Sequence, residues 1–200
     1  MNSGTKNFLA AMLIVVMSVG LTAGCGNSKE KIPPLITTTL RTENNVLEIS
    51  APFSLEKDLS VNDLGEMEAY LKESVMLSAQ KDGLMIMAFA YVCDKEKIEA
   101  ETGQTFTPNI EGAVIGAVGN IKTVRTSSDV SDVKINGIDG KEITGTLDIK
   151  FDGDSENTRC DFRMRAFGRG MTVWLVSVIR KPGDENKRVS DAVFNSLKLS

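Results

Sequence analysis

Histidine is absent from this sequence of 200 residues. Its absence excludes Ser-His-Asp triads, Cys-His dyads, histidine acid–base catalysis and most zinc sites. Positive charge is not in surplus, because 23 Lys and Arg residues accompany 27 Asp and Glu residues, so we expect no nucleic-acid partner. No glycine-rich phosphate loop follows a strand, and no two carboxylates stand out as an acid–base pair. We therefore expect a protein that is not an enzyme and that binds no cofactor.

The apolar run near the N-terminus is too short to span a membrane. It extends from Phe8 to Leu21 after the basic Lys6, whereas a spanning helix needs about 20 apolar residues. The run ends in the segment 21–25 (LTAGC), which polar residues follow. This segment resembles the lipobox of bacterial lipoproteins, in which a signal peptidase cuts before a cysteine that carries diacylglycerol. Thr22 stands where leucine is usual. The resemblance implies a signal peptide over 1–24 and a covalent lipid on Cys25.

Such a lipid would anchor the protein to the cell membrane or the outer membrane, with its domain on the extracytoplasmic side. Each buried methylene of the acyl chains contributes about 0.8 kcal/mol. A soluble secreted protein or an uncleaved anchor is the alternative. Residues 25–45 are expected to form the lipidated cysteine and a flexible tether, because 26–45 contain paired prolines and few large apolar side chains. Within the tether, 36–40 could add an edge strand. A single folded domain is then expected over 46–200.

Strands dominate the predicted domain. The runs 85–93 and 171–179 are apolar on both faces, which predicts central strands that are covered on both sides. Asp82-Gly83 predicts a tight hairpin turn, and the segment 136–140 (NGIDG) is rich in turn residues. Residues 143–151 and 158–166 alternate between apolar and polar side chains and predict a hairpin that places Phe151 opposite Thr158.

Two amphipathic helices are expected. Thr107 and Pro108 open the first, which continues to Ile121 with one apolar stripe. Its glycines predict a close approach of the helix backbone to a sheet; they are Gly112, Gly116 and Gly119. The second helix is expected over 185–198. Residues 67–77 fit either a helix or the first strand of the 82–83 hairpin.

The order of these elements resembles the PsbP-like superfamily, which includes bacterial envelope lipoproteins of the DcrB type. The resemblance rests on an early strand before Pro52 within SAPFS, on the central helix, on the NGIDG turn and on a closing AVFNSLK helix. Phe53 stands where the family often has tryptophan, and the one tryptophan is Trp174. The resemblance implies an α+β fold, an α/β/α sandwich on a mostly antiparallel central sheet. It also implies a non-catalytic binding or assembly role, and it transfers no site residue.

Three groups of residues are candidate sites. Cys93 and Cys160 could form a disulfide in an oxidising envelope, or remain buried free thiols. The loop 152–157 offers carboxylates that suit Ca²⁺, or else is a hydrated hairpin tip; its acidic residues are Asp152, Asp154 and Glu156. A basic stripe could meet an anionic lipid, polymer or protein, or else pair with acidic side chains of the fold; it comprises Arg159, Arg163, Arg165 and Arg169.

Together these features predict a membrane-anchored bacterial lipoprotein whose domain binds or assembles with an envelope protein. The alternative is a small-ligand or metal-binding domain that serves an envelope transporter or sensor.

Overall fold

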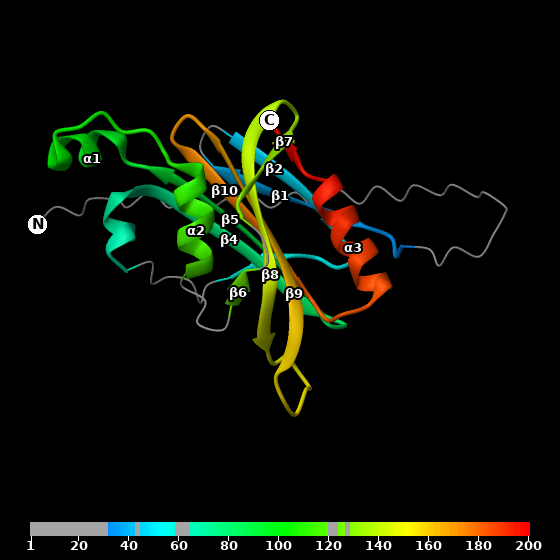
Figure 1. Ribbon diagram of the computed structural model, residues 1–200. Helices are drawn as coiled ribbons and strands as arrows, with labels where there is room; N and C mark the ends of the chain where they lie inside the picture. The colour runs from blue at the N-terminus through cyan, green and yellow to red at the C-terminus, as the bar shows by residue number, and fades with distance from the viewer. Residues whose placement is uncertain (1–31, 43–44, 59–64, 120–123, 127–128) are drawn as a thin grey trace, which may run out of the picture.

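The computed structural model describes residues 32–42, 45–58, 65–119, 124–126 and 129–200 (Figure 1). The predicted signal peptide and Cys25 lie outside the described residues. The described chain is a mixed α/β fold with three α-helices, and every strand pairing in it is antiparallel. None of its helices is long and apolar enough to cross a membrane.

The larger sheet has eight strands in the order β3-β4-β5-β10-β9-β8-β6, and β7 also pairs with β8. The strands are β3 (Glu56–Lys57), β4 (Leu71–Lys81), β5 (Leu84–Cys93), β6 (Val124–Thr126), β7 (Ser131–Ile135), β8 (Ile138–Ile149), β9 (Thr158–Arg169) and β10 (Thr172–Arg180). The strands β5 and β10, which were predicted to be central from their apolar faces, pair with each other in the middle of the sheet. That prediction is confirmed.

A second sheet has three strands, β1 (Ile36–Thr42), β2 (Asn45–Ala51) and β11 (Lys198–Leu199). The edge strand allowed at 36–40 is confirmed, since 36–42 form a strand at the edge of this sheet, paired with β2; the flexible tether predicted as far as residue 45 is therefore wrong at its C-terminal end. Leu40 of β1 is 1% exposed and belongs to the main core. This burial and the pairing with β2, which local composition does not reveal, make β1 part of the domain.

The two faces of the large sheet are covered differently. On one face, α3 (Asp184–Asn195) and the small sheet pack on β5 and β10 in a core that includes the fully buried Trp174. On the other face, α2 (Ile110–Gly119) packs on β8 and β9 through Val114 and Val118. Figure 1 shows the two helices lying along the sheet, α2 in green and α3 in red. Each helix packs on the sheet through its buried apolar side chains, which are Val114 and Val118 in α2 and Val189, Val193 and Phe194 in α3.

A third helix, α1 (Lys95–Thr102), lies at one end of the large sheet beside the 3₁₀ helix η1 (Gly65–Tyr70). Asp94 caps α1 by accepting a hydrogen bond from the backbone of Lys97, and Gly103 ends it in the left-handed conformation. The ambiguous segment 67–77 is divided between the end of η1 and the start of β4.

The two predicted tight turns are present, whereas the predicted register of the β8–β9 hairpin is wrong. Asp82-Gly83 and Asn136-Gly137 both have positive φ at both positions, as a type I′ turn requires. In the β8–β9 hairpin, however, Ile149 rather than Phe151 lies opposite Thr158. Phe151 is buried against α2's side of the sheet, and its carbonyl accepts from the backbone of Asp154, so it belongs to the loop.

The helix predictions also need correction. Asn109, and not Thr107, caps α2 through a hydrogen bond from the Gly112 backbone. The three helix glycines are exposed, and a Cβ at Gly116 or Gly119 would meet nothing within 4 Å. The glycine that admits close packing is Gly168 of β9, where a Cβ would collide with the Ile110 side chain. The last helix ends at Asn195, because 198–199 pair with β2 instead of continuing it.

Candidate functional site

The two described cysteines lie at opposite ends of the sheet. Cys93 donates from its backbone to Met171, directly before β10, whereas Cys160 adjoins Asp161, the partner of Arg180 at the far end of β10. Those ends are about 25 Å apart at the usual rise of a strand. A disulfide needs Cα atoms within about 7 Å. Of the two alternatives for Cys93 and Cys160, the structure therefore has the buried free thiols and not the disulfide.

The acidic loop between β8 and β9 does not gather its carboxylates. Both oxygens of Asp154 lie 2.8 Å from the Lys181 ammonium group, which also lies 5.3 Å from the centre of the Phe151 ring. Asp152 and Glu156 are exposed. In the part of the chain that the structure describes, no three His, Cys, Asp or Glu side chains are placed to hold a metal ion. The contact with Lys181 ties the loop to the end of β10.

The arginine stripe is covered in its middle. Arg163 and Arg165 both donate from Nε to Glu142 Oε2, at 2.7 and 2.5 Å. Arg163 also contacts Asp191 of α3, and both guanidinium groups lie within 5 Å of the Phe194 ring centre, at 4.7 and 4.9 Å. These two arginines hold α3 on the sheet and do not form an open site for an anion.

The outer members of the stripe remain on the surface. Arg159 lies opposite Asp148 and donates to Thr146, and Arg169 is exposed beside the β9–β10 turn. The structure therefore does not bring the four arginines together as one accessible patch.

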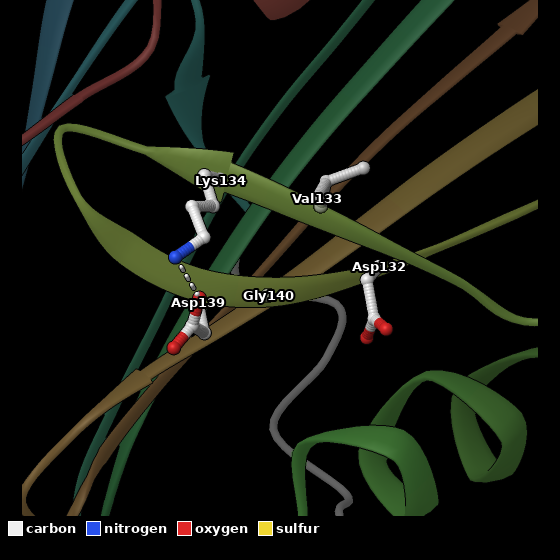
Figure 2. Close-up of a pocket in the computed structure, with 5 residues that line it drawn as sticks. All are labelled: Asp132, Val133, Lys134, Asp139 and Gly140. Carbon is white, nitrogen blue, oxygen red and sulfur yellow. Dashed lines mark ion pairs between the residues drawn. The ribbon is translucent and has the colours of Figure 1, made fainter.

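One hollow lies against the β7–β8 hairpin and has a volume of about 520 Å³ (Figure 2). The figure shows Lys134 and Asp139 pointing toward each other across the hairpin, where their charged atoms are 2.9 Å apart. Asp132 points away from that pair and binds Lys141, which also binds Glu111 of α2. The charges that line this hollow are thus already paired, and they fasten the hairpin to itself and to α2.

A second pocket, of about 500 Å³, lies between η1, α1 and the adjoining ends of β4 and β5. We call it the α1 pocket. Three aromatic side chains line it, from η1, from β5 and from the segment after α1: Tyr70, Tyr91 and Phe106. Aliphatic side chains and the Cys93 thiol complete the apolar lining, with Met67 41% exposed at its edge. This size and lining are typical of small-molecule sites.

Hydrogen bonds fix the wall after α1. The Thr102 hydroxyl donates to the Ile98 carbonyl and accepts from the Gln104 backbone. The Phe106 backbone N–H donates to Glu99 Oε1 at 2.8 Å. These bonds fold the chain back after Gly103 and hold the Phe106 ring in the pocket lining.

The pocket disfavours charge on its own hydroxyl and thiol. Burial, with a smaller contribution from Cys93, raises the pKa of Tyr91 to about 12. Burial also raises the pKa of the Cys93 thiol. Both groups are therefore protonated near neutral pH, which makes Cys93 a weak nucleophile.

The charged residue in the lining is Glu101. Nearby carboxylates on the same helix are engaged, Glu96 with Lys72 and Glu99 with Lys95. Glu101 has no ion pair with any residue that the structure describes. Sequence reasoning missed this pocket because it missed α1. The capping pair Asp94 and Gly103 is the local signal that could have found the helix.

No protein-family model matches this chain, and no curated protein matches it. The pocket geometry and the N-terminal sequence are therefore the grounds on which a function is proposed.

Proposed function

We propose that this protein is a lipid-anchored bacterial envelope protein whose domain binds another molecule and does not catalyse a reaction. The segment 21–25, with its cysteine after a short apolar run, is the observation that carries this proposal. We further propose that the domain has the PsbP-like α/β/α arrangement. The positions of α2 and α3 on opposite faces of an antiparallel sheet support that assignment.

The direction of β1 supports presentation of the α1 pocket away from the membrane. Asn45, where β2 begins, lies at the pocket end of the sheet, because its side chain donates to Thr172, one residue after the Met171 that binds Cys93. Thr42, where β1 ends, pairs with Asn45 and so lies at the same end. Ile36, where β1 begins, is about 20 Å away along the seven-residue strand. Figure 1 shows β1 beginning on the side opposite α1. A tether to Cys25 would thus leave the domain at the end remote from the pocket.

The partly buried ionic contacts of the domain have a structural role. Glu142 is shared by two arginines beneath α3, and Asp154 is bound to Lys181. Each contact joins separate elements of the fold, so these charges stabilise structure. The α1 pocket, in contrast, is a mainly apolar concave surface. This pocket favours the second candidate function, a small-ligand domain that serves an envelope transporter or sensor.

Mass spectrometry of the protein from its native membrane tests the anchor. We expect the mature chain to begin at Cys25 with thioether-linked diacylglycerol, and a Cys25→Ser variant to leave the membrane fraction. The matched control is Cys93→Ser, which should be retained in the membrane. An unmodified Cys25 in membrane-extracted protein, or unchanged fractionation of Cys25→Ser, would overturn the anchor.

A further inference from the structure

We propose that the α1 pocket binds a small organic ammonium ion, with its apolar body against the aromatic walls and its charge beside Glu101. This proposal deepens the binding role proposed above and rests on it, but it does not depend on the lipid anchor. A quaternary or alkyl ammonium group is attracted to aromatic faces and needs little desolvation compared with a compact metal ion. A pocket of about 500 Å³ suits a molecule of this size.

The aromatic lining supplies the first argument. Tyr70 of η1, Tyr91 of β5 and Phe106 of the segment after α1 reach the pocket from three separate parts of the chain. One of these rings already makes a cation–π contact within the protein, since Lys97 Nζ lies 5.7 Å from the centre of the Tyr70 ring. A second ring contact, 5.4 Å between the centres of Phe89 and Tyr91, helps to hold Tyr91 in place behind the pocket.

Charge supplies the second argument. Glu101 is the one charged side chain among the described residues that line the pocket, and it has no ion pair with them. The segments around the pocket, 67–74 and 94–106, contain six acidic residues and three lysines. The three lysines are occupied: Lys72 and Lys95 contact carboxylates, and Lys97 lies over Tyr70. The net field at the pocket therefore favours a cation over an anion.

Binding to the full-length purified protein tests the inference, with benzyltrimethylammonium as the probe and dimethylbenzylcarbinol as a neutral molecule of nearly the same shape. Methyl NMR signals of Met67 and Ile98 report occupancy of the pocket. We expect saturable shifts of both signals, and about fivefold tighter binding of the cation than of the alcohol, as about 1 kcal/mol of charge and cation–π attraction predicts.

Three variants separate the contributions. Glu101→Gln should remove most of the preference for the cation while the alcohol still binds. Glu96→Gln, which removes the same charge from the same helix outside the pocket lining, should retain the preference. Lys97→Gln should tighten binding of the cation, because it removes a competing positive charge from Tyr70. The variants alter exposed side chains, and circular dichroism checks that each is folded.

Equal binding of the cation and the alcohol would overturn the inference, as would equal effects of Glu101→Gln and Glu96→Gln. Absence of any shift at Met67 and Ile98 at millimolar probe would also overturn it. The lipid analysis of Cys25 is a separate measurement. A modified Cys25 with an empty pocket would retain the anchor and reject this ligand, whereas ligand binding with an unmodified Cys25 would do the reverse.

Discussion

Arg163 of β9 donates from Nε to Glu142 Oε2 of β8 at 2.7 Å, beneath the C-terminal half of α3. The neighbouring Arg165 shares the same oxygen, and Phe194 covers both guanidinium groups. The side chain of Glu142 is 14% exposed, so solvent screens this contact only weakly. Two cations thus share one carboxylate at the surface on which α3 packs, and Asp191 of α3 supplies a second negative charge beside Arg163.

Glu142→Gln should destabilise the protein by about 2 kcal/mol, because it leaves the partly buried Arg165 without its charge partner and Arg163 with Asp191 alone. Urea denaturation measures the change. Asp139→Asn is the control, since it removes a carboxylate from the exposed pair with Lys134, where the expected loss is below about 0.5 kcal/mol. Equal effects of the two substitutions would contradict a structural role for Glu142.

Two glycine substitutions should have opposite signs. At Gly140 of β8 an added Cβ would lie 2.6 Å from the Ala166 carbonyl oxygen and would also collide with the Phe167 ring, so Gly140→Ala should cost about 1–3 kcal/mol. Gly116 lies on the exposed side of α2 with nothing within 4 Å of the new Cβ. Gly116→Ala should stabilise the protein by about 0.5–1 kcal/mol. Thermal unfolding measures the stability of both variants relative to the wild type. Loss of stability in Gly116→Ala would contradict the exposed placement of that residue.

Alkaline pH should destabilise the wild-type protein through Tyr91. Its pKa is raised by burial to about 12 from an ordinary value of 10.0, so the folded state holds the proton more strongly than the unfolded state. The contribution of this residue is complete below about pH 10 and is lost as pH rises toward 12, by up to about 2–3 kcal/mol. Tyr91→Phe should match wild-type stability at neutral pH and lose less stability between pH 9 and 12. Identical pH profiles of the two proteins would refute the burial of this hydroxyl.

Thiol titration should find Cys93 and Cys160 reduced in protein prepared without reductant. In the native state both should react slowly at pH 8, since burial raises the pKa of each thiol and both side chains are covered. Cys93 lines the α1 pocket, so a small apolar maleimide should label it before Cys160, which is 0% exposed. Cys93→Ser and Cys160→Ser identify the faster site. Failure to find either thiol after denaturation would restore the disulfide.

Truncation of the Leu40 side chain tests the extension of the domain into the expected tether. Leu40→Ala should cost about 2–4 kcal/mol, because it leaves a cavity in the main core. Ile36, at the start of the same strand, is 38% exposed, and Ile36→Ala should cost less than about 1 kcal/mol. A stability of Leu40→Ala equal to wild type would return 36–42 to the tether.

Local sequence signals predicted the parts of the fold whose cause is local. Asp82-Gly83 and Asn136-Gly137 determine type I′ turns because those residue types tolerate positive φ. The run 85–93 determines a central strand because it has no polar face to expose to water. The outward position of the α2 glycines and the register of the β8–β9 hairpin were not predicted, since both depend on which surface the rest of the chain presents.

By itself, the sequence determined the two central strands, the tight turns at Asp82-Gly83 and Asn136-Gly137, and the absence of histidine chemistry. Only the tertiary structure decided which residues meet. It places Cys93 and Cys160 beside opposite ends of β10, and it pairs Glu142 with two arginines. It also places Glu101 in the lining of an aromatic pocket. The physical reason is that turn and strand preferences arise from neighbours along the chain. Contacts between charges, thiols and rings arise from register and helix packing, which bring residues far apart in the chain to the same place.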